Sequence, residues 1–129
     1  MPIVYKLDQA AGLVRTTVTG PITVEDILNH LKNTIREKVL PLAELVDARE
    51  ASPPFLSPND MRLLAERILA MTFDRQALGP RAVVVEDLTM FGLVRIFATF
   101  VSTVFTINVF RRSQDAEAWL IEQTGARRP

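Results

Sequence analysis

The chain has 129 residues, 48% of them apolar and 23% charged, with fifteen Lys and Arg balanced by fifteen Asp and Glu. That length suits one domain with a single core, and the composition is that of a folded chain rather than a disordered one. Zero net charge removes the basic surface that nonspecific nucleic-acid binding needs. Because the chain has no Cys and only one His, disulfides, thiolate chemistry and cysteine- or histidine-rich metal sites are excluded, and we expect no cofactor.

The first residues show no basic segment followed by an apolar one, so we expect a cytoplasmic protein without a secretory signal. Residues 3–7 and 13–19 are rich in β-branched side chains, and the segment between them contains Gly12. This pattern predicts an antiparallel hairpin. Pro21 ends its second strand, because proline cannot donate to a strand ladder.

Thr23 and Asp26 have the spacing of a capping box and predict a helix over about 24–38, which stops before Pro41. Its apolar stripe recurs at helical spacing: Val24, Ile27, Leu28, Leu31 and Ile35. His30 falls on the opposite side of this helix, and we expect it to face solvent.

A short apolar run over 42–47 predicts a buried strand, and 48–57, with two adjacent prolines, predicts a loop. Ser57 as N-cap, with Pro58 and an acid after it, is a strong helix start. The inward face of this second helix is predicted to hold Met61, Leu64, Ala65, Ile68, Leu69 and Thr72.

The run 81–87 is β-branched and ends in acids, which is typical of a central strand covered on both faces. A helix over 88–103 and a strand over 104–110 follow. The last predicted helix covers 113–123, with Ser113 as its N-cap and Ala116, Trp119 and Leu120 inward.

The predicted order is therefore β-β-α-β-α-β-α-β-α, an α/β fold with a mixed, mostly parallel sheet flanked by helices. Residues 1–124 form one domain in this interpretation, and 125–129 form a disordered C-terminal tail.

The segment 88–110 is mostly apolar and holds five of the chain's seven phenylalanines. A membrane span is disfavoured, because Arg95 would lie inside it and because the pattern changes from helical to alternating near Val104. As a helix, 88–103 is apolar over more of its circumference than one sheet can cover. We expect a second copy of the chain to cover the rest in a homodimer; the alternative is a small apolar ligand or lipid. The residues predicted to face that partner or ligand are Phe91, Val94, Arg95, Phe97, Ala98 and Phe100.

Asp47, Glu86 and Asp87 stand at the predicted carboxyl ends of two parallel strands, where open α/β sheets bind ligands. Three carboxylates there suit Mg²⁺ and an acid-dependent enzyme. The alternative, which we favour, is that they cap turns and pair with nearby arginines. No phosphate-binding glycine loop accompanies them.

Ser52 and Ser57 are the candidate phosphorylation sites. Ser57 is first of all a helix N-cap, but a phosphoryl group at a helix N-terminus is also favourable, which makes a switch physically reasonable. Trp119 is interpreted as a core anchor.

Six strings follow the predicted element order: LVR, GPITVED, LVDAR, SPND, VFRR and AWL, at 13–15, 20–26, 45–49, 57–60, 109–112 and 118–120. Together they resemble the bacterial STAS/SEC14-like superfamily, the group of the anti-sigma factor antagonists, and within it the small stand-alone uncharacterised members. The resemblance covers nearly the whole chain.

This resemblance implies a four-helix, mixed-sheet domain that binds partners rather than turning over a substrate. The antagonists carry a phosphorylatable serine in an Asp-Ser-Ser/Thr-Gly string after the third strand. The segment from Asp47 to Asp60 lacks that string, so only Ser57 and Ser52 are carried over. The sequence thus favours a cytoplasmic, non-enzymatic regulatory domain that pairs with itself or with another regulatory protein, with an apolar-ligand carrier as the alternative.

Overall fold

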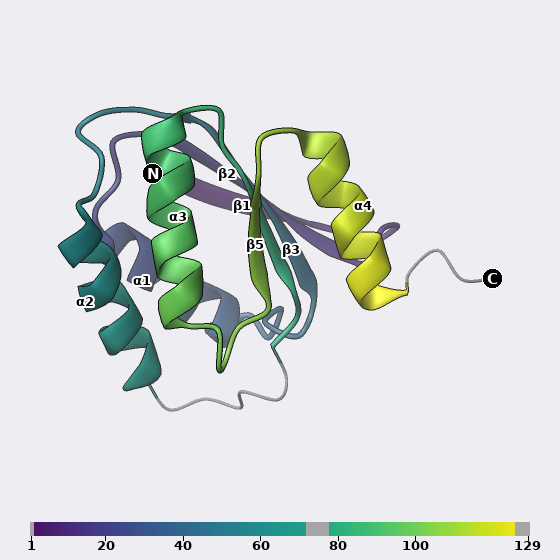
Figure 1. Ribbon diagram of the computed structural model, residues 1–129. Coiled ribbons are helices and arrows are strands. Elements are labelled where there is room, and N and C mark those ends of the chain that lie inside the picture. The colour runs from purple at the N-terminus through teal and green to yellow at the C-terminus, as the bar shows by residue number, and fades with distance from the viewer. Residues whose placement is uncertain (1, 72–77, 126–129) are drawn as a thin grey trace.

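Five strands form one sheet in the order β1-β2-β3-β4-β5 in the computed structural model, which describes residues 2–71 and 78–125 (Figure 1). The strands and helices alternate as predicted after the opening hairpin. Their bounds are β1 Ile3–Asp8, β2 Leu13–Gly20, α1 Val24–Arg36, β3 Ala43–Ala51, α2 Pro58–Leu69, β4 Arg81–Val84, α3 Leu88–Phe100, β5 Ile107–Phe110 and α4 Ser113–Thr124.

Strand pairing confirms the mixed sheet. β1 and β2 pair antiparallel, and every later pair is parallel. Gly12 supplies a positive φ of 63° in the hairpin turn, a conformation that glycine adopts without steric cost. The sheet is thus a hairpin extended by three parallel strands.

The helices cover the two faces unequally. α1, α2 and α3 lie on one face of the sheet, and α4 lies on the other (Figure 1). Because each crossover from β2 to β5 steps in the same direction, a common crossover hand places its helix on the same face. α4 follows the last strand and is free to close the opposite face.

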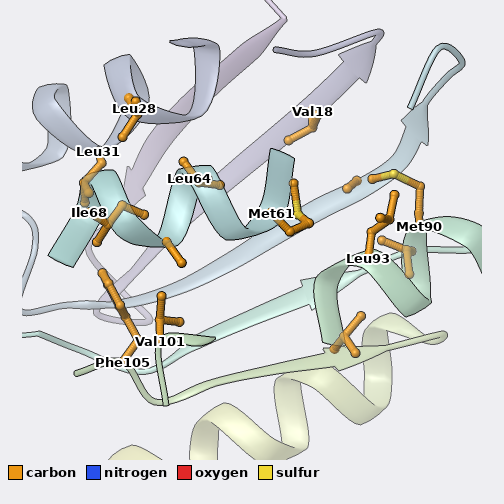
Figure 2. Close-up of a cluster of buried hydrophobic side chains, with 14 of the residues drawn as sticks. Val18, Leu28, Leu31, Met61, Leu64, Ile68, Met90, Leu93, Val101 and Phe105 are labelled. Carbon is orange, nitrogen blue, oxygen red and sulfur yellow. The ribbon is translucent and has the colours of Figure 1, made fainter. Parts of the chain in front are cut away.

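Each face has its own hydrophobic cluster. The larger joins the sheet to α1, α2 and α3, and Figure 2 shows its members Leu28, Leu64 and Leu93 reaching in from these three helices. The smaller joins Leu45 and Val84 to Ala116 and Leu120 of α4, with Trp119 partly buried against it. The inward residues predicted for α4 are therefore confirmed.

Both predicted capping boxes are present. Thr23 Oγ1 accepts from the Asp26 amide at 3.1 Å while Asp26 Oδ2 accepts from the Thr23 amide at 2.8 Å. Ser57 and Asp60 repeat this exchange at 3.0 and 2.8 Å, with Pro58 in the first turn. Each box satisfies two backbone N–H groups that a helix start would otherwise leave without partners.

Several predicted boundaries were wrong. β3 continues to Ala51, into the predicted loop, because after an irregularity at Thr17–Thr19 it pairs again with β2 as far as Gly20. α1 ends at Arg36 and β4 at Val84, each a few residues before the predicted end. A turn over 101–104, in which the Val104 and Phe105 amides both donate to the Val101 carbonyl, separates α3 from β5, so α3 stops earlier and β5 begins later than predicted.

The predicted N-cap of α4 was also wrong. Arg112 occupies the cap position and makes no side-chain cap hydrogen bond. Ser113 is already helical, and its hydroxyl contacts Glu117 instead, at 3.4 Å. Thr72, predicted on the inward face of α2, and 126–129 of the predicted tail lie outside the described residues, whereas Gly125 ends α4 with a positive φ.

No helix within residues 2–71 and 78–125 is long and apolar enough to cross a membrane. The apolar segment that raised the question is divided between α3, a turn and β5, as its change of period predicted.

The Ser57 cap predicts a specific stability change. Ser57→Ala removes the acceptor for the Asp60 amide and should lower the free energy of unfolding by about 1 kcal/mol, whereas Ser57→Asp should stay within a few tenths because Asp caps about as well. Urea denaturation measures both. Ser52→Ala is the matched control, since the described residues offer its hydroxyl no hydrogen bond. A Ser57→Ala protein as stable as the control would contradict the role of the cap.

Candidate functional site

A cavity of about 180 Å³ lies between the sheet and the three helices α1, α2 and α3. Its wall is almost entirely apolar and includes the labelled Leu31, Met61, Leu64 and Phe105 of Figure 2. α3 contributes Met90, Leu93, Val94 and Phe97.

The cavity wall crosses the sheet from Ile3 of β1 to Ile107 of β5 and also runs along β3. Glu44, near the start of this strand, and Ala51 and Ser52, at its end, all line it, with Val46 and Ala48 between them. Seven residues of extended strand separate Glu44 from Ala51, a span of about 23 Å. The wall therefore follows most of the length of the central strand.

Four polar side chains gather where β3 and β4 begin: Thr16 of β2, His30 of α1, Glu44 of β3 and Arg81 of β4. We call them the polar cluster. All four line the cavity. Glu44 and Arg81 are direct neighbours in the parallel register, which places their side chains on the same face of the sheet.

The Glu44 carboxylate is the centre of this cluster. Its Oε2 accepts from the Thr16 hydroxyl at 2.5 Å and lies 2.6 Å from His30 Nε2. Its Oε1 lies 3.2 Å from Arg81 Nε. The side chains of Glu44 and Arg81 are only 6% and 9% exposed, so this is a buried ion pair.

Arg81 is held by more than Glu44. Its guanidinium donates to the Gly79 carbonyl at 2.5 Å and to the Leu40 carbonyl at 3.4 Å, and it lies 5.7 Å from the centre of the Phe105 ring. Each of its three nitrogens thus has a partner. A buried cation needs this degree of compensation to remain charged.

Burial and bonding act in opposite directions on the two charges. Burial raises the pKa of Glu44, but the hydrogen bond with His30, the charge of Arg81 and the Thr16 hydroxyl outweigh it and bring the pKa below its ordinary value. Burial lowers the pKa of Arg81, and the charge of Glu44 acts against that change. The arrangement keeps Glu44 ionised, because three partners favour its charged form.

Tyr5 lies beside this cluster. Its ring meets the His30 ring edge-on, with centroids 5.5 Å apart. Its hydroxyl is buried and has no hydrogen-bond partner among the described residues. An unsatisfied buried hydroxyl costs free energy, so this end of the site is less well compensated than the Glu44–Arg81 pair.

The predicted solvent exposure of His30 was wrong. Its side chain is only 14% exposed and bonds to Glu44, because α1 turns this face toward the start of β3. Glu44 and Arg81 were not predicted as site residues. The available signals were a carboxylate inside the apolar run 42–46 and an arginine opening the run 81–85, both in positions where a strand is otherwise buried.

The structure separates the residues predicted on α3. Val94 and Phe97 line the cavity of their own chain, so part of the apolar excess is accounted for without a second subunit. Phe91 and Ala98 are half-buried, and Arg95 is exposed. Leu88 and Phe100, near the two ends of the helix, remain 70% and 43% exposed.

Of the three acidic residues, Asp47 pairs with an arginine and Asp87 caps a helix, as in the favoured interpretation, but the predicted position of Asp47 was wrong, because it lies inside β3 rather than at its carboxyl end. Asp47 accepts two side-chain hydrogen bonds from Arg49, both at 2.9 Å, and these lower its pKa. Asp87 is the N-cap of α3 and accepts from the Met90 amide at 3.0 Å. Glu86 is exposed. In the described ranges no group of three or more acidic or His side chains is placed to hold a metal ion.

Comparison with solved structures identifies the fold. A crystal structure of an uncharacterized protein of the DUF3478 family from Shewanella loihica PV-4 matches with a TM-score of 0.57 and 18% sequence identity, over 92% of this chain and 91% of that chain. Its description gives a SpoIIAA-like fold. This chain has a SpoIIAA-like fold. The STAS-like architecture predicted from its sequence strings is therefore confirmed.

No protein-family model matches the chain, and no curated protein matches it.

The buried ion pair predicts strong coupling between its partners. Arg81→Met or Glu44→Leu alone leaves an uncompensated buried charge and should cost about 3–5 kcal/mol of stability. The double variant Glu44→Leu/Arg81→Met removes both charges, so its loss should be well below the sum of the two. A double-mutant cycle in urea measures the coupling.

The exposed i,i+4 pair Arg62–Glu66 is the matched control for this cycle and should show far weaker coupling. Additive losses at Glu44 and Arg81 would show that the two charges do not depend on each other.

Proposed function

We propose that this chain is a non-catalytic binding domain that holds an apolar molecule in the cavity between its sheet and α1, α2 and α3. The observation that supports this most is the apolar wall, to which three helices and the central strand contribute. An empty cavity costs stability in proportion to its volume, at most about 4 kcal/mol for 180 Å³. An apolar occupant offsets that cost by restoring contacts that the wall lacks.

The absence of a catalytic role is supported by how the charged groups of the site are used. Glu44, Arg81 and His30 bond to one another rather than standing apart as an acid and a base. Glu44 has its pKa lowered, whereas a general acid or base that works near neutral pH needs a raised carboxyl pKa.

Ala48 offers a direct test of the site. It lies in the middle of β3 and lines the cavity, so Ala48→Leu places three more carbons inside it. We expect wild type to bind the neutral apolar dye N-phenyl-1-naphthylamine with a rise in fluorescence, and Ala48→Leu to weaken this binding at least tenfold. Filling the cavity should leave the stability unchanged or raise it by about 0.5–2 kcal/mol.

Ala118→Leu, the same change on the exposed side of α4, is the control and should bind the dye like wild type. Native mass spectrometry of the purified protein provides a second measurement, since a retained ligand would appear as added mass. Dye binding unchanged by Ala48→Leu, or absent from wild type, would refute the cavity as the binding site.

A second candidate function is a regulatory domain that associates through α3. Its partner is either a second copy of the chain, in a homodimer, or another regulatory protein. The exposure of Leu88 and Phe100 on this helix favours it, because large apolar side chains at 70% and 43% exposure are natural contacts for a partner.

Leu88→Lys tests that dimer alone, because Leu88 is exposed and is not part of the cavity wall, whereas a substitution at Val94 would also change the cavity. If α3 is the interface, light scattering coupled to size exclusion should give a dimer for wild type and a monomer for Leu88→Lys. Leu63→Lys, on the exposed side of α2, should leave the dimer intact. A monomeric wild type would eliminate self-association through α3 and leave the ligand-binding function untouched.

A further inference from the structure

The cavity offers an occupant two kinds of surface. Its wall is almost entirely apolar, and the polar cluster stands where β3 and β4 begin. An occupant therefore needs a mostly apolar body, and a polar group that it carries is accommodated at this cluster.

The polar cluster restricts the head group of such a chain. Arg81, the cation that lines the cavity in this cluster, already pairs with Glu44, and its other two nitrogens donate to backbone carbonyls. A ligand carboxylate placed here would meet the ionised Glu44 and a cation that is already neutralised. Like charges in a buried site oppose each other strongly, so an anionic head group is disfavoured.

One hydrogen-bonding position in the cluster is still open to a donor. Oε2 of Glu44 interacts with both Thr16 and His30, whereas among the described residues Oε1 has Arg81 as its one partner. A carboxylate has about four lone-pair sites, so Oε1 is able to accept another hydrogen bond. A neutral hydroxyl supplies such a bond without adding charge.

We propose that the cavity takes an apolar molecule that ends in an uncharged hydrogen-bond donor, an alcohol in chemical class, with this head group at the polar cluster. The inference rests on the proposed function and adds to it the head-group chemistry of the ligand. Glu44 is then the specificity-determining residue, because it neutralises Arg81 and accepts from the head group.

Competition against N-phenyl-1-naphthylamine at pH 8 tests this on the folded chain. Decan-1-ol should bind at least tenfold more tightly than decanoate, which has the same chain length and an anionic head. From hexan-1-ol upward, affinity should rise about fourfold per methylene and level off once the chain fills the cavity.

Glu44→Gln tests the head group directly, because the amide keeps the shape of the side chain and leaves Arg81 without its counter-charge. In this variant the preference should reverse, so that decanoate competes better than decan-1-ol. If the variant does not fold, the wild-type series still decides the proposal.

The outcomes separate this inference from the function on which it rests. Equal affinity for decan-1-ol and decanoate would overturn the head-group proposal, while dye binding that depends on Ala48 would still support the cavity. An unchanged preference in folded Glu44→Gln would place the head group away from Glu44. Failure of every alcohol to displace a dye that does bind would overturn the inference alone, whereas failure of the dye as well would overturn both.

Discussion

The ionised carboxylate of Glu44, buried on the inner face of the central strand, is the constraint on which much of this structure depends. Burial of such a charge is unfavourable unless partners surround it. Thr16, His30 and Arg81 reach it from β2, α1 and β4, so a single side chain connects three strands and a helix. The same requirement gives the cavity a polar end in an otherwise apolar wall.

A backbone constraint places Arg81 for this role. A Cβ atom at Gly79 would collide with the carbonyl groups of Pro41 and Leu42, so only glycine lets the two segments approach this closely. The approach allows the Gly79 amide to donate to the Leu40 carbonyl at 3.1 Å. It also places the Gly79 and Leu40 carbonyls where the Arg81 guanidinium donates to both. Gly79 therefore also supplies one of the two backbone carbonyls that accept hydrogen bonds from the buried Arg81.

The sequence predicted the fold well because local signals and periodicity agree along most of the chain. The capping boxes at Thr23 and Ser57 fix two helix starts through bonds three residues apart, which a sequence displays directly. β3 was predicted too short because Arg49 and Glu50 face solvent, and because its end is held by pairing of Glu50 and Ala51 with β2, which is a long-range interaction.

The site was harder to predict for the same reason. Glu44 and Arg81 are 37 positions apart, and only the parallel register of β3 and β4 makes them neighbours. His30 was assigned to solvent because α1 was judged by its one apolar stripe. In the structure, Glu44 of β3 and Tyr5 of the edge strand β1 contact a second side of this helix at His30. Asp47 and Asp87, by contrast, keep the local roles that short spacing indicated. α3 is apolar around much of its circumference, as the sequence shows. Part of this apolar surface faces the cavity of the same chain, since Val94 and Phe97 line it.

Methyl NMR spectroscopy tests the central claim, that this chain binds an apolar molecule between its sheet and α1, α2 and α3. Decan-1-ol titrated into protein labelled at Leu and Val methyl groups should shift the resonances of Leu31, Val46 and Val94, which line the cavity. The methyl groups of Leu13 and Leu120, in the cluster beneath α4, should stay unchanged. Shifts confined to the α4 face or to Leu88, or no shifts at saturating alcohol, would contradict the account.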